Sequence, residues 1–256
     1  MTSMLDRRPG HAVIEAVLHE QSLAVPRTRL DVLFGLNALA PAARPWYAGA
    51  LGELHVGQIL ASLPPTWKVF HALPVGTQTT DIDHLVVGPG GVFPVNTKHH
   101  RGQKIWLGER MVMVAGQRTD YIRNSVSEGR RVAKLVGKLG VEAGNVRPVI
   151  CLVSPGPVTI RQRPAGVSVA TDGELYQFLI RQPQRLDALT VARIAQLFDN
   201  PGTWRTLPAS HDPYPVFEQL RKDVERANTR RALWSLALAG AAVAGFFGMY
   251  SVLLGH

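Results

Sequence analysis

Three polar residues near the middle of the chain have the types and spacing of a phosphodiester-cleaving site. Asp83 lies late in one expected strand, and Asn96 and Lys98 lie two residues apart in the next. Residues two apart share one face of a strand, and Asp83 and Asn96 are equally far from the turn between the strands, which makes them cross-strand neighbours. A carboxylate with a second oxygen ligand can hold Mg²⁺, and a lysine can neutralise charge that develops on a phosphate.

The elements that position these residues are read from hydrophobic periodicity and turn signals. The turn is Gly88-Pro89-Gly90-Gly91, which joins the two strands as a hairpin. Helices are expected over 46–63 and 121–139, on either side of the strands. The expected strands cover 67–72, 79–87, 92–98, 104–107, 111–114, 149–153 and 167–170.

The order of the elements predicts an α/β fold, with a mixed β-sheet flanked by helices. Two further helices are expected over 173–181 and 190–198, the first capped by Thr171 or Asp172. Before the sheet, residues 1–45 form a helical extension in two pieces interrupted at Pro26. The expected divisions are therefore 1–45, a nuclease-like domain over 46–182, a helical region with a polar linker and a basic segment over 183–231, and residues 232–254.

Residues 232–254 contain no charged side chain, which predicts a transmembrane helix. Trp234 and Tyr250 near its ends are typical of membrane interfaces, and the arginines before it place the bulk of the chain in the cytoplasm by the positive-inside rule. The small residues Ala241 and Gly245 have the spacing that allows a homodimer through this helix. The alternative is a buried core helix.

Composition limits the kind of partner and excludes one kind of covalent cross-link. Lys and Arg number 28 against 19 Asp and Glu, a net charge of +9, which favours an anionic partner, either nucleic acid or an acidic membrane. The single cysteine, Cys151, excludes an intrachain disulfide and lies in an apolar run that is typical of a core strand.

A set of short motifs resembles a known family. Gly52-Glu53 in a helix, Ile82-Asp83-His84 in a strand, Gly90-Gly91-Val92-Phe93 at the turn and Asn96-Thr97-Lys98 in the next strand are similar to the nuclease-related domain (NERD). The resemblance covers roughly residues 47–180. It implies a relationship to the PD-(D/E)XK nucleases, with a restriction-endonuclease-like sheet and Mg²⁺ or Mn²⁺ as cofactor.

The resemblance also implies roles for individual residues. Asp83 matches the metal-binding aspartate, Lys98 the catalytic lysine, and Glu53 the helical acid that completes the metal site. The family's usual Glu-x-Lys glutamate is Asn96 in this chain. Because asparagine offers one neutral carbonyl oxygen where glutamate offers two charged ones, metal affinity and catalysis should be weakened.

An acid elsewhere offers a compensation. The family usually has Asn-Pro-x-x-Gln at the start of a helix after the hairpins, whereas this chain has Asn124-Ser125-Val126-Ser127-Glu128. We hypothesise that Glu128 supplies the missing carboxylate, which makes Asp83, Glu53 and Glu128 the metal ligands. The alternative is an ordinary exposed helix glutamate.

Other polar and aromatic residues have more than one interpretation. His84, His99 and His100 lack zinc-site spacing and, with Arg101, are expected to form a basic rim near a phosphate path. Trp106 is expected in the core with Met111 and Met113, with base stacking as the alternative. A basic face on one helix suits either phosphate contacts or simple solvation; its residues are Arg123, Arg130, Arg131, Lys134 and Lys138.

Three functions remain open on this evidence. The first is a membrane-anchored, metal-dependent nuclease acting on DNA or RNA. The second is a catalytically silent nucleic-acid-binding module, which Asn96 favours. The third is a membrane interaction scaffold. Salt-dependent nucleic-acid binding and metal-dependent cleavage separate them.

Overall fold

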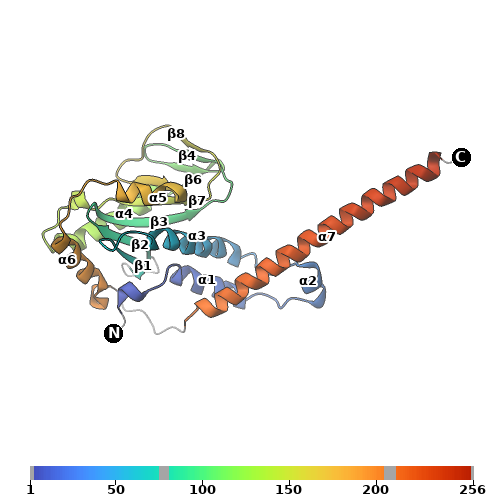
Figure 1. Cartoon of the computed structure of the whole chain (residues 1–256), viewed down its shortest axis with the longest axis horizontal. Coiled ribbons are helices and arrows are strands. Elements are labelled where there is room, and N and C mark those ends of the chain that lie inside the picture. The colour runs from blue at the N-terminus through green and yellow to red at the C-terminus, as the bar shows by residue number, and fades with distance from the viewer. Residues whose placement is uncertain (1–2, 75–80, 205–211, 255–256) are drawn as a thin grey trace. The chain divides into compact units, whose positions relative to one another are not determined.

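The computed structural model describes residues 3–74, 81–204 and 212–254, apart from the side chains of 248 and 250–254 (Figure 1). The chain divides into two compact units. The first comprises Met1–Val13 and Trp46–Ser210, and the second comprises Ile14–Pro45 and His211–His256.

A five-stranded mixed sheet forms the centre of the first unit, in the strand order β1-β2-β3-β7-β9. The strands are β1 (Lys68–Pro74), β2 (Asp81–Gly88), β3 (Gly91–His99), β7 (Val149–Val153) and β9 (Ser168–Thr171). β1, β2 and β3 pair antiparallel, and β7 and β9 continue the sheet in parallel. The predicted mixed sheet and its central hairpin are confirmed, except that residues 79 and 80 lie outside the described part.

Helices cover both faces of this sheet (Figure 1). α3 (Ala43–Ala61) and α5 (Asp172–Ile180) pack on one face, where Leu60 and Leu175 lie in a core with Phe93. α4 (Tyr121–Gly137) and α6 (Ala188–Asp199) pack on the other, where Val132 and Ile194 join Leu85. Three short 3₁₀ helices connect elements: η1 (Met4–Asp6), η2 (Ala143–Asn145) and η3 (Pro201–Thr203).

Two glycines allow helices to approach the sheet closely. A Cβ on Gly52 of α3 would lie 3.0 Å from the His99 Cβ and 3.3 Å from the Thr97 Cγ2, both on β3. A Cβ on Gly129 of α4 would lie 2.2 Å from the Pro148 Cγ, just before β7. Each glycine is next to a glutamate, so the packing that it permits brings an acid to the sheet.

A second, smaller sheet has the strand order β6-β5-β4-β8. Its strands are β4 (Ile105–Leu107), β5 (Val112–Val114), β6 (Gln117–Thr119) and β8 (Val158–Ile160). The hairpin of β4 and β5 was predicted, whereas β6 and β8 were not.

The core interpretation of Trp106, Met111 and Met113 is wrong. Alternate residues of a strand point to opposite faces, and Ile105 and Leu107 occupy the inner one. Trp106 and the two methionines lie on the outer face and are partly exposed.

Three helices form the second unit: α1 (His11–Ser22), α2 (Arg29–Phe34) and α7 (Tyr214–Leu254). The break between α1 and α2 at Pro26 was predicted. α7 holds the end of α2 through hydrogen bonds to its carbonyl groups, from Arg230 to Val32 (2.8 Å) and from the Trp234 indole to Leu33 (3.0 Å).

The predicted transmembrane helix at 232–254 is not supported. Among the described residues, no helix is long and apolar enough to cross a membrane. The side chain of Tyr250, predicted at an interface, lies outside the described part.

Replacing Gly129 tests the close approach of α4. Gly129→Ala should lower the free energy of unfolding by about 1–3 kcal/mol, because the new methyl group overlaps Pro148. Gly137→Ala on the same helix is the control, since a Cβ there meets nothing within 4 Å; it should be neutral or stabilising by up to about 1 kcal/mol. Urea unfolding midpoints measure both, and equal midpoints would contradict the close approach.

Candidate functional site

Asp83 lies on β2 at the point where the ladder with β3 ends. The last ladder pair is His84 with Val95, so the same register puts Asp83 opposite Asn96, as expected from the turn. The Asp83 Oδ2 accepts a hydrogen bond of 2.6 Å from the Thr97 backbone N–H. Burial raises the pKa of Asp83 above its ordinary value, although the charge of Lys98 and the Thr97 N–H oppose the shift.

Asn96 is buried, and its side chain contacts Glu128 of α4. The Asn96 Nδ2 donates to the Glu128 Oε1 at 2.9 Å and to the Oε2 at 3.1 Å. The α4 acid therefore lies beside the residue that replaces the family's usual glutamate. Burial, and secondarily the charge of Asp83, raise the pKa of Glu128 to about 7.

The Asn96 carbonyl oxygen is a free acceptor in the interior. Because an ionised carboxylate only accepts, the amide nitrogen must face Glu128 and the Oδ1 points elsewhere. This Oδ1 is buried and has no hydrogen-bond partner among the described residues. A buried polar atom without a partner is costly unless a ligand completes it.

Glu53 of α3 is a buried acid close to the same strands. Its residue is only 7% exposed. Burial first, and then the charges of Asp83 and Asp81, raise its pKa well above the ordinary value, while Lys98 and the Gly10 backbone N–H oppose the shift. Its electrostatic interaction with Asp83 and Lys98 places it near the site, on the helix brought close by Gly52.

Lys98 lies at the end of β3, where Tyr121 of α4 faces it. The Lys98 Nζ is 5.2 Å from the centre of the Tyr121 ring, a cation–π distance. The Tyr121 hydroxyl is 2.9 Å from the His100 Nε2, and the two rings stack. The ring of Tyr121 therefore lies between the lysine and His100, and the contact with His100 fixes its position.

Asp81 is a residue of the site that sequence reasoning missed. Its charge raises the pKa of both Glu53 and Asp83, so it lies close to them. The signal was available: Asp81 and Asp83 are two apart in one strand, and such residues share a face.

The three acids predicted to hold the metal, Asp83, Glu53 and Glu128, are not gathered into one cluster. Within the described ranges, no three His, Cys, Asp or Glu side chains form a ready-made metal cluster. Mg²⁺ needs only one or two carboxylates because it retains water ligands. Asp83, Glu53 and Glu128 have raised pKa values and Asn96 has a free buried oxygen, so a cation would relieve both repulsion and the unpaired acceptor.

The predicted basic rim of histidines is wrong for His84, whereas His99 and His100 are both half-buried. His84 is fully buried, with its Nδ1 2.8 Å from the His71 Nδ1, because it points to the opposite face of β2 from Asp83. Burial lowers the pKa of His71 to about 4 and that of His84 well below its usual value, so both are neutral near pH 7. The His99 ring is held by the Ala48 carbonyl at 2.8 Å, and Arg101 is exposed.

The basic face of α4 is exposed, as solvation or phosphate contact would require. Arg123 pairs with Asp120 at 2.8 Å.

Cys151 is a buried core residue, as predicted, and burial raises its pKa to about 12, which excludes a reactive thiolate.

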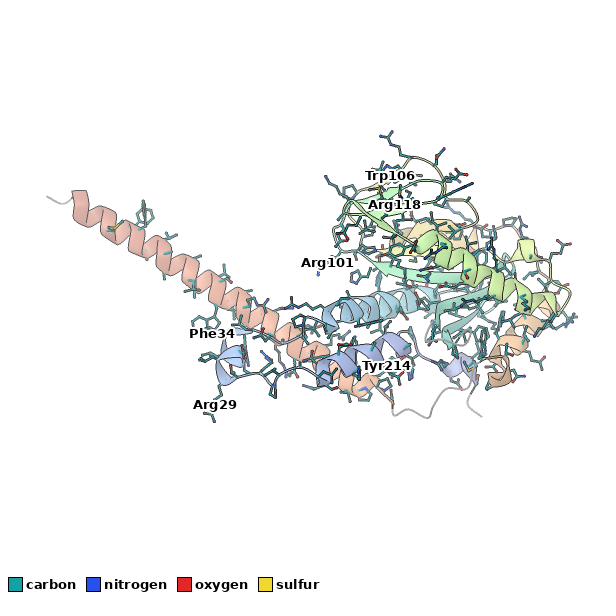
Figure 2. All side chains as sticks on the ribbon, turned by 180° about the vertical axis from the view of Figure 1, so that it is seen from behind. Arg29, Phe34, Arg101, Trp106, Arg118 and Tyr214 are labelled. Carbon is teal, nitrogen blue, oxygen red and sulfur yellow. The ribbon has the colours of Figure 1, made fainter. Side chains whose placement is uncertain are left out.

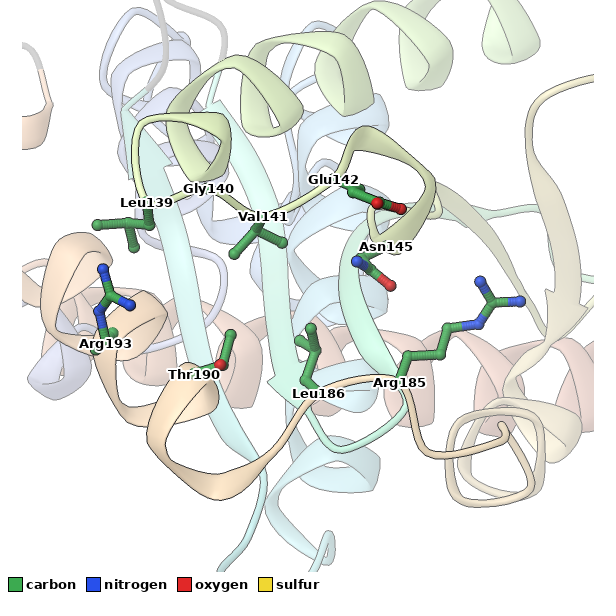
Figure 3. A pocket seen from close by; sticks show the side chains of 9 residues that line it. All are labelled: Leu139, Gly140, Val141, Glu142, Asn145, Arg185, Leu186, Thr190 and Arg193. Atoms are coloured by element: carbon green, nitrogen blue, oxygen red, sulfur yellow. The ribbon is translucent and has the colours of Figure 1, made fainter.

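A separate pocket lies between α6 and the segment that follows α4 (Figure 3). Arg185, Arg193 and Glu142 bring charge to its wall. None of the predicted site residues lines it, so it belongs to a different part of the first unit.

Comparison with known proteins identifies a domain in this region. Residues 48–153 match the nuclease-related domain, NERD. A segment of 77 residues is 39% identical to an uncharacterized protein of Bacillus anthracis, covering 28% of this chain and 36% of that protein; the chain thus spans about a third of the length of this curated relative. A structure of Pyrococcus furiosus SfsA in complex with Ca²⁺ is similar at 14% identity, with a TM-score of 0.23, over 59% of this chain and 54% of that one.

The raised pKa of Glu128 predicts a pH dependence of stability. A folded-state pKa above the ordinary 4.5 gives a stabilising contribution that is complete below about pH 4.5 and is lost as pH rises through about 7. Glu128→Gln should therefore gain stability relative to wild type between pH 5 and 8, by at most about 3 kcal/mol.

Urea unfolding at several pH values measures this effect. Glu109→Gln, at an exposed position of the β4–β5 hairpin, is the matched control and should follow wild type. A Glu128→Gln curve parallel to wild type over this range would contradict the buried, desolvated carboxylate.

Proposed function

We propose that this protein is a metal-dependent nuclease that hydrolyses phosphodiester bonds of DNA or RNA at the site around Asp83. The observation that carries the proposal is the contact between Asn96 and Glu128. An acid of α4 thus lies beside Asn96, and the proposal is that it replaces the strand glutamate that the nuclease-related domain usually has. Asp83 and Lys98 lie close enough to act electrostatically on the same acid.

The side chains would divide the work between binding the phosphate and binding a divalent cation. Lys98, oriented by Tyr121, would bind a phosphate oxygen and neutralise charge that develops in the transition state. Glu128 would hold the cation as an ionised carboxylate, and the attacking water would lose its proton to the surrounding solvent. Asp83 keeps one carboxylate oxygen on the Thr97 N–H, which fixes its orientation.

A divalent cation would be held by Asp83, Glu128 and the free carbonyl oxygen of Asn96, with Glu53 as a further acid beside them. When bound, Mg²⁺ or Mn²⁺ polarises the phosphoryl oxygen and lowers the pKa of a coordinated water. It would also lower the pKa of each carboxylate that it contacts.

A second function, nucleic-acid binding without cleavage, is favoured by one observation. Asn96 contributes no charge, so the site has one carboxylate fewer on β3 than the usual motif. In this case metal would bind weakly and the exposed basic face of α4 would supply the affinity. The cytoplasmic location and a homodimer stay predictions.

Cleavage assays separate the two functions. Full-length protein should cut single- or double-stranded DNA or RNA with Mg²⁺ or Mn²⁺ and not with EDTA. Asp83→Asn and Lys98→Ala should each lose at least about 100-fold in rate, since each removes a charge at the reacting phosphate. Glu142→Gln, in the separate pocket, should match wild type; equal rates in all four proteins would reveal a contaminating nuclease.

An exchange of two residues tests the displaced acid. Glu128→Gln should reduce cleavage, and Asn96→Glu in the same chain should restore much of it, because the hydrogen-bonded pair is then reversed with its total charge unchanged. Asn96→Glu alone puts two acids in contact and should raise the pKa of one of them. If the double variant cleaves no better than Glu128→Gln, Glu128 does not supply the missing carboxylate.

A further inference from the structure

The outer face of the small sheet carries a row of solvent-accessible side chains, including one tryptophan, that the nuclease site does not use. Strand pairing aligns Arg118 of β6, Met113 of β5, Trp106 of β4 and Thr159 of β8. Residues directly opposite one another in neighbouring strands point to the same side. The four side chains therefore form one row across the sheet, and Figure 2 shows Trp106 and Arg118 on it.

The Trp106 ring lies flat enough on the sheet to cover Gly108. A Cβ on Gly108 would lie 2.8 Å from both the Cη2 and the Cζ3 of the indole. The glycine thus provides the space in which the ring rests, and Trp106 as a whole remains partly exposed. A tryptophan that rests on backbone and stays partly exposed can stack on a further planar group.

The surroundings of this row are strongly basic. Segments 101–119 and 158–164 contain six basic residues and one acidic residue, Glu109; the basic ones are Arg101, Lys104, Arg110, Arg118, Arg161 and Arg163. By strand alternation, Lys104 and Arg161 are on the face that carries Trp106. Arg118, Lys104 and Arg161 are exposed, and in the described part of the chain none of them forms an ion pair.

A partly exposed tryptophan and methionine among unpaired cations are features suited to binding single-stranded nucleic acid. Bases stack on the aromatic ring, and arginines follow the phosphates. In a duplex the bases are already stacked on each other, so a flat aromatic platform gains little from it. Neutral apolar partners would leave the cations without counter-charges.

The small sheet also lies close to the proposed catalytic residues along the chain. β4 and β8 pair in parallel just beyond β3 and β7, which also pair in parallel. The inner face of the small sheet packs on the first turn of α4, which contains Tyr121, the neighbour of Lys98. Trp106 follows Lys98 by eight residues, which limits their separation to about 28 Å.

We propose that the outer face of the small sheet, with Trp106 as stacking platform and Arg118, Lys104 and Arg161 as phosphate contacts, binds single-stranded nucleic acid. This rests on the proposed function and names its substrate as single-stranded. It assigns to Trp106 a contact with a base distant from the bond that is cut.

Binding of full-length protein to a fluorescein-labelled dT₂₀ oligonucleotide in EDTA tests the proposal. Trp106→Ala should weaken binding about tenfold, the loss typical of one stacked base, and Trp106→Phe should retain most of the affinity. Trp46→Ala is the matched control, because Trp46 is an exposed tryptophan on α3; it should bind like wild type. Arg118→Ala should weaken binding and reduce its salt dependence, whereas Arg181→Ala, an exposed arginine after α5, should not.

Two results would overturn the proposal. One is equal binding of dT₂₀ by Trp106→Ala and Trp46→Ala. The other is tighter binding of a 20-base-pair duplex than of dT₂₀, with the same loss in Trp106→Ala. Loss of affinity in Arg118→Ala without loss in Trp106→Ala would leave only a charged surface and also reject the stacking role.

A small substrate keeps this test separate from the test of catalysis. Bis(p-nitrophenyl) phosphate has one phosphodiester and no further nucleotide that could occupy the face around Trp106. If the protein hydrolyses it with Mn²⁺, Trp106→Ala should do so at the wild-type rate. Hydrolysis without dT₂₀ discrimination would leave the nuclease and reject the platform, and dT₂₀ discrimination without hydrolysis would do the reverse.

Discussion

The arrangement of the site depends on the close approach of two helices to neighbouring strands, from opposite faces of the sheet. α3 approaches β3 at Gly52 and α4 approaches the start of β7 at Gly129. In each helix the residue next to the glycine is an acid, Glu53 or Glu128. A side chain of ordinary size at either glycine would push the helix outward by the width of a methyl group or more, and the neighbouring carboxylate would move with it.

That proximity buries carboxylates at an electrostatic cost. Glu53, Asp83 and Glu128 all have raised pKa values, with burial as the largest cause and repulsion from Asp83 or Asp81 added to it. The protein offsets part of the cost with the Thr97 N–H, the Asn96 amide and the charge of Lys98. Cation binding would offset the rest, since an added positive charge favours every ionised form at once.

The sequence was sufficient for the hairpin that carries the site and insufficient for the details around it. The Gly88–Gly91 turn fixes the register of β2 and β3, so the proximity of Asp83 and Asn96 followed from counting. Glu128 could be proposed only because a family pattern marked its position. The partly exposed position of Trp106 was missed, because in a three-residue strand the buried face is decided by what the neighbouring residues pack against. The strands β6 and β8, which complete the small sheet, were also not predicted.

The large sheet is irregular at Asp83, where the regular pairing of β2 with both of its neighbouring strands is interrupted. Ladder pairs join His71 with His84 and Leu73 with Ile82, but Ala72, which stands opposite Asp83 between them, has a left-handed φ of 49°. A non-glycine residue in this conformation costs on the order of 1–3 kcal/mol and persists only where the surrounding structure enforces it. On its other side Asp83 lies just past the last β2–β3 pair, so neither neighbour holds it in a regular ladder. Its carboxylate instead forms the link to β3, through the Thr97 N–H, which ties the position of the acid to the strand that carries Asn96 and Lys98.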